Sequence, residues 1–283
     1  MRFSLIVATR GRTFELLRFL DSLLKQTFSS FEVVIVDQNE DERVASLLDA
    51  YRDRLVLTHL RASPGASRAR NLGANHARGE ILTFPDDDCW YPPDLLARVD
   101  TFFCSGSEWH GLTGMAVDEE GRPSVGRWAK RAGPITRWNE WTRSAESVIF
   151  LRREVFVSLG GFDERLGPGA GTPWASCEGD DLLLRALERG FRLYYTPEVR
   201  VYHPDPLGKG RDRDPGLPLR ALAYGRGMGY VLRKHGYPLP YAAYHLLRPL
   251  GGALWAWLRL DPHRARYHLA VFQGRVRGWL GRP

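Results

Sequence analysis

Three adjacent carboxylates, Asp86, Asp87 and Asp88, are the residues whose types and spacing most directly indicate chemistry in this sequence. They follow an apolar, β-prone run at residues 80–84 and precede Pro92 and Pro93, a pair typical of a helix start. Adjacent acids repel one another, and a divalent cation such as Mg²⁺, which binds carboxylates together with substrate phosphates, would relieve that repulsion. The position at the end of a strand therefore predicts a metal and diphosphate site. A solvated acidic turn at a helix start is the alternative.

The elements before the acidic run alternate between two apolar patterns. Residues 3–8 and 31–36 are continuous apolar runs, as expected of strands buried on both faces of a parallel sheet, and residues 55–60 form a weaker third run. Residues 14–24 and 44–51 instead carry apolar side chains at helical spacing. The order strand, helix, strand, helix, strand predicts a doubly wound α/β sheet with right-handed crossovers.

The middle of the chain is less regular. We expect helices at residues 67–78 and 93–103, loops and strands over 106–143, a strand at 147–151, a short helix at 153–159, a helix that opens at Glu178, and two short strands at 193–196 and 199–203. The aperiodic stretch 106–143 is rich in Gly, Trp and Arg, and such loops often carry contacts to a second substrate.

The chain changes character after residue 205. Residues 205–218 are polar and rich in Gly and Pro, which indicates a linker or a loop that orders on ligand binding. Helices are expected at residues 219–234, 241–260 and 264–280, the middle one apolar but broken by Pro249 and the glycine pair at 251–252. This is no uninterrupted apolar run of membrane-spanning length. An interfacial helix pair flanked by Arg and Trp fits better, and a helical subdomain or dimer face is the alternative.

The composition indicates one large α/β domain or a domain with an appendage. The 283 residues are 43% hydrophobic and carry a net charge of +7, with the excess concentrated at the C-terminal end. That charge favours anionic partners, namely nucleotide diphosphates, membrane headgroups or nucleic acid. Cys89, Cys104 and Cys177 match neither a disulfide framework nor a zinc pattern, and the first residues carry no secretory signal pattern. We therefore expect a reducing, cytoplasmic location.

Six motifs in a fixed order resemble the family 2 inverting glycosyltransferases with the GT-A fold. They are LIVATRGR (residues 5–12), VIVDQ (34–38), GASRARNLG (65–73), PDDD (85–88), GGFDE (160–164) and EGDDL (178–182), and His203 after the last strand also fits. The matching blocks cover about residues 1–205 and leave the C-terminal helices outside. The resemblance implies an α/β fold with a Rossmann-like, mostly parallel sheet flanked by helices, with a C-terminal helical appendage.

The resemblance also implies roles for residues at the strand ends. Residues implied for binding the nucleotide, its ribose or its diphosphate are Thr9, Arg10, Asp37, Arg68, Arg70, Asn71, Asp86 and Asp87. Asp88 is the implied ligand of Mn²⁺ or Mg²⁺, with Asp86 as its partner in a D-x-D pair. His203 is a further implied ligand, although a histidine beside a proline can instead be structural.

Inversion requires a carboxylate that takes the proton of the acceptor hydroxyl. In many family members this is the Asp of a Glu-Asp pair at the start of the late helix, but Gly179 occupies that position here. Glu178, Asp180 and Asp181 are the candidates, and Glu178 is favoured because it is expected to precede the helix and point into the cleft. Asp181 could instead serve as a carboxylate at the helix N-terminus.

Other classes of protein fit less well. A Rossmann oxidoreductase needs a G-x-G-x-x-G motif after the first strand, whereas the glycine-rich residues 225–229 come late in a helical region. A sugar nucleotidyltransferase would carry a glycine-rich, Lys-bearing N-terminal loop, and the first lysine is Lys25. A nucleic-acid-binding module would leave the acidic run unexplained, and a non-catalytic scaffold with this fold would lack that run.

The sequence therefore predicts a metal-dependent inverting glycosyltransferase that moves a sugar from a nucleotide-sugar, UDP-linked by family habit, to a hydroxyl acceptor in cell-surface glycan synthesis. Residues 1–105 would bind the donor, and residues 106–205 would bind the acceptor and supply the base. Residues 206–283 would form a linker and helices that bring the enzyme to an anionic membrane surface at its inner face and to a lipid-linked or glycan acceptor. No nucleic-acid partner is expected.

Overall fold

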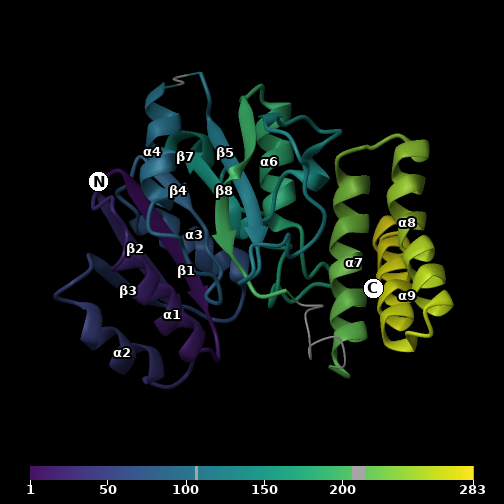
Figure 1. Ribbon diagram of the computed structural model, residues 1–283, viewed down its shortest axis with the longest axis horizontal. Helices are drawn as coiled ribbons and strands as arrows, with labels where there is room; N and C mark the ends of the chain where they lie inside the picture. Colours follow the sequence, from purple (N-terminus) through teal and green to yellow (C-terminus); the bar gives the residue numbers. More distant parts are fainter. Residues whose placement is uncertain (106–107, 206–213, 283) are drawn as a thin grey trace.

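The computed structural model describes residues 1–105, 108–205 and 214–282, and an eight-stranded sheet forms its centre (Figure 1). The strands are β1 (Phe3–Thr9), β2 (Phe31–Asp37), β3 (Leu57–Arg61), β4 (Ile81–Thr83), β5 (Gly111–Val117), β6 (Gly133–Pro134), β7 (Ile149–Arg152) and β8 (Leu193–Tyr202). Their order across the sheet is β3-β2-β1-β4-β7-β5-β8-β6. The strands expected within 106–143 are β5 and β6, and the remaining described residues of that stretch are mainly loop.

The first four strands are parallel, and the sheet becomes mixed beyond them. β1 lies between β2 and β4, and β3 pairs with the outer side of β2. The continuous apolar sequences of β1 and β2 are buried because helices cover both faces of the sheet. β7 runs antiparallel to β4 and to β5, whereas β5 and β8 are parallel. The carboxyl ends of β1, β2 and β4 therefore meet at one edge.

Helices flank the sheet and connect its strands. They are α1 (Phe14–Leu23), α2 (Arg43–Leu48), α3 (Ala66–His76), α4 (Leu95–Ser105), α5 (Arg153–Ser158) and α6 (Glu178–Glu188), with short 3₁₀ turns η1 (Asp49–Tyr51), η2 (Glu140–Thr142) and η3 (Glu146–Val148). The sequence prediction of a mostly parallel α/β sheet flanked by helices is confirmed.

The prediction of two short strands at 193–196 and 199–203 is wrong, because β8 is continuous through Pro197. The pairing with β5 shifts in register between Thr113 and Met115, and this irregularity accommodates the proline. Gly114 lies at the shift, where an added Cβ would stand 2.2 Å from the carbonyl oxygen of Val199. The strand therefore bends without ending.

The predicted break in the middle C-terminal helix is also wrong. α7 (Leu217–Lys234), α8 (Leu239–Leu258) and α9 (Pro262–Trp279) pack together, and α8 continues through Pro249. A proline at this position leaves the carbonyl of His245 without its helical N–H partner. Nη1 of Arg275 on α9 donates to that carbonyl at 2.6 Å, so a neighbouring helix supplies the missing bond.

α9 lies between α7 and α8 (Figure 1) and approaches α7 through glycines. An added Cβ at Gly229 would stand 2.0 Å from the Arg275 carbonyl oxygen, and one at Gly278 would stand 2.1 Å from that of Arg226. Gly225 and Gly274 meet the facing backbone in the same way. The late glycine-rich stretch of the sequence is therefore a helix-crossing surface.

Within the described residues, no helix combines the length and apolar character needed to cross a bilayer. Most of the predicted linker at 205–218 lies outside the part of the chain that the structure describes. The C-terminal helical appendage itself is confirmed, and α7 is the helix of this unit that faces the sheet domain (Figure 1).

Candidate active site

The chain brings three of the predicted site segments together because parallel strands end at the same edge of the sheet. Thr9 and Asp37 are paired across the ends of β1 and β2, and the acidic run follows β4 directly. His203 comes from a different part of the sequence and reaches the same place because β8 ends beside this edge, with Tyr202 bridging to Trp90.

Asp86, Asp88 and His203 form a candidate metal centre. One ligand atom from each, together with the Cys89 sulfur, lies within 4.8 Å of all the others. Nε2 of His203 is 3.4 Å from Oδ1 of Asp88 and 3.7 Å from Oδ2 of Asp86. Nδ1 of His203 lies 2.7 Å from the Pro204 carbonyl oxygen, which can only accept, so Nδ1 carries the proton. The Nε2 lone pair is then free to face a cation.

The residues of this centre fit a hard divalent cation. Oδ1 of Asp88 is buried and has no hydrogen-bond partner within the described chain, and an unpaired buried carboxylate oxygen is costly. Carboxylate oxygens and one imidazole nitrogen suit Mn²⁺ or Mg²⁺. Burial raises the pKa of the Cys89 thiol well above its ordinary value, and a soft sulfur suits Mn²⁺ or Mg²⁺ less well than carboxylate oxygens do.

Asp87 belongs to a different set of contacts. Its Oδ2 accepts from Thr9 Oγ1 at 2.8 Å, and its Oδ1 lies 2.5 Å from Nη1 of Arg12. Burial raises the pKa of Asp87 although Arg12 and Thr9 oppose that shift. Arg12 also contacts Asp88 at 3.0 Å and therefore partly neutralises the acidic run. The sequence analysis assigned Arg12 no role. Its position two residues after Arg10, in the turn that follows the first strand, could have indicated one.

A cavity of about 650 Å³ opens beside the ends of β2 and β3. Arg10 lines it, together with Gln38, Asn39 and Arg61. Asp37 is fully buried, and its Oδ1 accepts from the backbone N–H of Asn39 at 2.9 Å and from its side chain at 2.7 Å. Asp37 thus fixes Asn39 at the cavity wall.

The three predicted polar residues of α3 have different surroundings. Arg70 is buried and donates to Asp86 Oδ1 at 2.8 Å and to Glu178 Oε1 at 2.7 Å. Burial opposes its charge, but the two carboxylates prevail and raise the pKa of Arg70. Asn71 instead pairs with the backbone of Phe162, and Arg68 is exposed and donates to the Pro64 carbonyl.

The three candidate bases on α6 also separate. Glu178 is the first residue of α6, where a position before the helix was expected, and it is buried against Arg70. Burial raises the pKa of Glu178, while Arg70 opposes the shift. Asp180 is half-buried, and its Oδ1 accepts from Ser144 Oγ at 3.3 Å.

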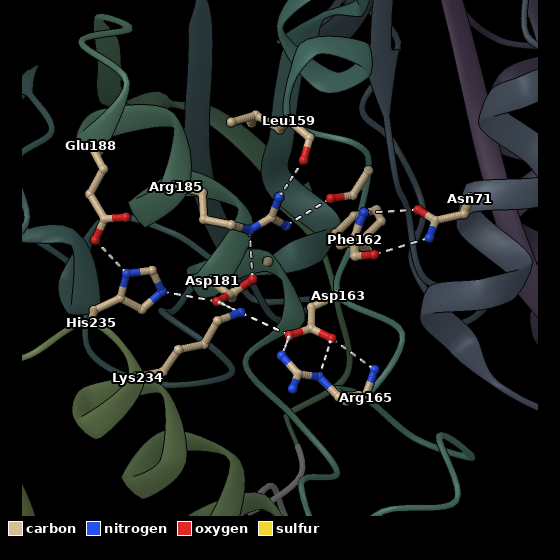
Figure 2. A network of polar contacts seen from close by, with 12 residues as sticks. Asn71, Leu159, Phe162, Asp163, Arg165, Asp181, Arg185, Glu188, Lys234 and His235 are labelled. Carbon is tan, nitrogen blue, oxygen red and sulfur yellow. Dashed lines mark hydrogen bonds and ion pairs between the residues drawn. The ribbon is translucent and has the colours of Figure 1, made fainter.

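Asp181 lies in a network of charged and polar side chains (Figure 2). Its carboxylate contacts Lys234 Nζ at 2.6 Å, His235 Nε2 at 2.9 Å and Arg185 Nε at 2.8 Å. Burial alone would raise its pKa, but the bonds from His235 and Lys234 lower the pKa of Asp181 to about 2. Both oxygens are engaged, so the structure places Asp181 in the junction between α6 and α7.

Glu146 is an acid of this region that carried no role in the sequence analysis. It begins η3 just before β7, and its Oε1 accepts from the backbone N–H of Gly179 at 3.1 Å. Burial, followed by the negative charges of Glu178 and Asp180, raises the pKa of Glu146 to about 8. Glu146 lies beside α6 because of the position that β7 takes in the sheet. The sequence spacing does not predict that position.

Comparison with known proteins identifies the family. Residues 4–131 match the profile described as "Glycosyl transferase family 2". The chain is 36% identical over 205 residues to an uncharacterized glycosyltransferase of Haemophilus influenzae, a match that covers 70% of this chain and 67% of that protein. The chain belongs to glycosyltransferase family 2. The family and enzyme class predicted from the six motifs are confirmed.

Other similar proteins are longer or more distant. The chain is 31% identical over 246 residues to the O-antigen biosynthesis protein RfbC of Myxococcus xanthus, which covers 76% of this chain but only 18% of that protein. Residues 1–349 of S. aureus TarS with UDP-GlcNAc superpose with a TM-score of 0.64 at 19% identity, covering 100% of this chain and 93% of that one. The mannosyltransferase PcManGT of Pyrobaculum calidifontis, with GDP-Man and Mn²⁺, gives 0.64 at 18% identity, with coverages of 100% and 88%. These structures show the shared GT-A fold.

Proposed function

We propose that this family 2 glycosyltransferase moves a sugar from a nucleotide-sugar to a hydroxyl acceptor, with inversion and with Mn²⁺ or Mg²⁺ bound at Asp86, Asp88 and His203. The observation that carries the proposal is the buried Oδ1 of Asp88, which has no hydrogen-bond partner among the described residues and lies close to ligand atoms of Asp86 and His203. Support also comes from the bound molecules named for two proteins of the same fold, UDP-GlcNAc in TarS and GDP-Man with Mn²⁺ in PcManGT.

The chain's own residues would divide the work of donor binding. The cavity beside β2 and β3, with Arg10 at its wall and Asp37 behind it, would take the nucleoside. Thr9 and Arg12 hold Asp87 in place, so Asp87 would act through its position beside the diphosphate. The bound metal would stabilise negative charge on the departing diphosphate.

The polar residues of α3 would have different roles. Arg70 keeps Asp86 and Glu178 in fixed positions. Arg68 is exposed beside the Gly65 turn and free to reach an anion, whereas Asn71 would orient the loop at Phe162.

Residues 1–105 would hold the donor, and residues 106–205 would shape the acceptor side. The acids at the α6 N-terminus lie between these halves because Glu178 is tied through Arg70 to Asp86. The relative RfbC is described as an O-antigen biosynthesis protein. We therefore assign the enzyme to cell-envelope glycan synthesis, with UDP as the first nucleotide to test.

Calorimetric titration of UDP, GDP and dTDP, each with and without Mn²⁺, tests the proposal. One nucleotide should bind, and its affinity should rise at least tenfold when the metal is present. A folded protein that binds none of the three would contradict the proposed function. Release of the nucleoside diphosphate from UDP-GlcNAc or GDP-mannose, followed over time, then identifies the donor.

We propose in addition that the C-terminal helices rest on an anionic membrane surface. The α8 apolar face, defined here as Tyr244, Leu247, Leu250, Leu254, Trp255 and Leu258, is exposed along the helix. Its leucines recur at the spacing of one helical face. Residues 217–282 contain eleven Arg and Lys but a single acid, Asp261. An apolar face with basic flanks matches the charge and depth of an anionic lipid surface.

Sedimentation with lipid vesicles tests this second proposal. The protein should bind phosphatidylglycerol-containing vesicles and not pure phosphatidylcholine, and the double variant W255S/L258S should lose at least tenfold in binding. Phe14→Ser is the matched control, because Phe14 is also exposed but lies on α1. Unchanged vesicle binding by the double variant, or a dimer in ultracentrifugation that the variant abolishes, would contradict the membrane proposal. Duplex DNA should not compete for the surface.

A further inference from the structure

The space beside Gly179 is filled by a carboxylate from another element. A Cβ added to Gly179 would stand 2.9 Å from Cγ of Glu146 and 3.0 Å from Cδ1 of Ile149. Both contacts are closer than side chains normally approach, so residue 179 has room for a larger side chain only if Glu146 moves and the δ-methyl group of Ile149 also shifts. The hydrogen bond from the Gly179 N–H holds the Glu146 carboxylate in that space.

The groups around Glu146 come from every part of the site. They are Arg70 on α3, Asp86 after β4, Glu140 in η2, Glu178 and Asp180 on α6, and Tyr224 on α7. The Cys177 thiol is also close, and burial raises the pKa of both Cys177 and Tyr224, so both are neutral. Arg70 is a cation whose charge lowers the pKa of Glu146, and Arg70 is already engaged by Glu178 and Asp86.

Two of the three carboxylates considered from the sequence, Glu178 and Asp181, are less free to accept a proton from a substrate. Glu178 is buried and accepts from the Arg70 guanidinium, and Asp181 is enclosed by Lys234, His235 and Arg185. Glu146 accepts a single weak donor, a backbone N–H, and it keeps part of its surface exposed. Burial and its acidic neighbours raise the pKa of Glu146 into the range that suits proton transfer near neutral pH.

We propose that Glu146 is the general base that deprotonates the acceptor hydroxyl. This inference rests on the proposed glycosyl transfer. The acceptor oxygen forms a bond to the anomeric carbon while the bond from that carbon to the diphosphate oxygen breaks. The electron pair of the broken bond leaves with the nucleoside diphosphate. The hydroxyl proton passes to the Glu146 carboxylate, which returns it to solvent after the product leaves.

The first test compares wild type with E146Q, using release of UDP from UDP-GlcNAc and of GDP from GDP-mannose, with water or a bacterial lipid extract as acceptor. Turnover should fall about 10²–10⁴-fold in E146Q. Metal-dependent binding of the nucleoside diphosphate and the melting temperature should be unchanged. The wild-type rate should rise with pH up to about 8, and that rise should be absent in E146Q.

A relocated carboxylate gives the second test, one that a structural role would not satisfy. E146A removes the nearer of the two side chains beside Gly179, so that, when E146A is combined with G179D, only a small shift of the Ile149 δ-methyl group is needed for the new side chain to fit. The double variant E146A/G179D should recover at least tenfold over E146A, whereas G179D alone should lose activity because the introduced carboxylate collides with Glu146. E146Q within threefold of wild type, with its pH profile intact, would overturn the assignment of Glu146. A wild type without transfer or metal-dependent binding would instead overturn the proposed function.

Discussion

Two buried carboxylate clusters lie within this fold, and they differ in whether their oxygens are paired. In the metal cluster, defined by Asp86, Asp88 and His203, Oδ1 of Asp88 accepts no hydrogen bond within the described residues. In the junction cluster, defined by Asp163, Asp181, Arg185, Lys234 and His235, one oxygen of Asp181 contacts Lys234 and the other contacts Arg185 (Figure 2). Both clusters contain acidic residues that lie close together in the sequence. Of the two, the metal cluster is the one with a buried carboxylate oxygen that accepts no hydrogen bond from the described residues.

The difference follows from the cost of burying charge. A buried carboxylate is stable only when hydrogen bonds and opposite charges replace the water it has lost. The junction cluster meets this need with residues of the chain, so it holds α7 against α6. The metal cluster does not, so it is suited to an added cation. The first cluster should therefore control activity and the second should control stability.

The largest effect is expected at the metal cluster. Asp88→Asn should reduce transfer by about 10⁴-fold, because a metal contributes several kcal/mol and each 1.36 kcal/mol is a factor of ten. Metal-dependent nucleotide binding should be lost, and the free energy of unfolding should change by less than about 1 kcal/mol. Calorimetry and urea unfolding measure both quantities. Asp94→Asn, an exposed acid paired only with Arg98 among described residues, is the control. An Asp88→Asn protein with wild-type metal response would refute the metal assignment.

The reverse pattern is expected at the junction cluster. Asp181→Asn should lower the free energy of unfolding by about 3–5 kcal/mol, because it removes a buried carboxylate that buried His235, Arg185 and the more exposed Lys234 share. Metal-dependent nucleotide affinity, measured at a temperature where the variant is folded, should stay within about threefold of wild type. Asp49→Asn removes an exposed ion pair and should cost less than about 1 kcal/mol. If Asp181→Asn removed metal-dependent nucleotide binding without lowering the free energy of unfolding, the assignment of activity to one cluster and stability to the other would be wrong.

The smallest effect is the pH dependence of the junction. The pKa of Asp181 is about 2 in the folded protein, below its ordinary value of 3.8. A lowered folded-state pKa stabilises the protein above the unfolded value and loses that contribution as pH falls toward the folded value. The difference in unfolding free energy between wild type and Asp181→Asn should therefore narrow by about 2 kcal/mol between about pH 5 and pH 2. Urea unfolding across this range measures it, and a constant difference would argue against the charged network.

The metal cluster was the more predictable of the two. Apolar runs identified β1, β2 and β4, and the ends of parallel strands meet by geometry, so Thr9, Asp37 and the acidic run could be placed together from the sequence. The junction could not be placed, because Glu178 and Asp181 lie within one helical turn and their different neighbours depend on how α7 docks. Glu146 was missed for a similar reason, since its neighbour Gly179 is distant in sequence. The continuous α8 was missed because Arg275 replaces the bond that Pro249 removes.

The glycine crossing of α7 and α9 gives the C-terminal helices a mechanical property. Gly229 and Gly278 bring the two backbones into direct contact, so no layer of side chains can rearrange between them. We therefore expect α7 and α9 to move together as one unit. α7 ends at Lys234, which contacts Asp181 in the first turn of the helix that begins with Glu178. A movement of the C-terminal helices would therefore shift Lys234 and, through Asp181, the first turn of α6, which begins with Glu178.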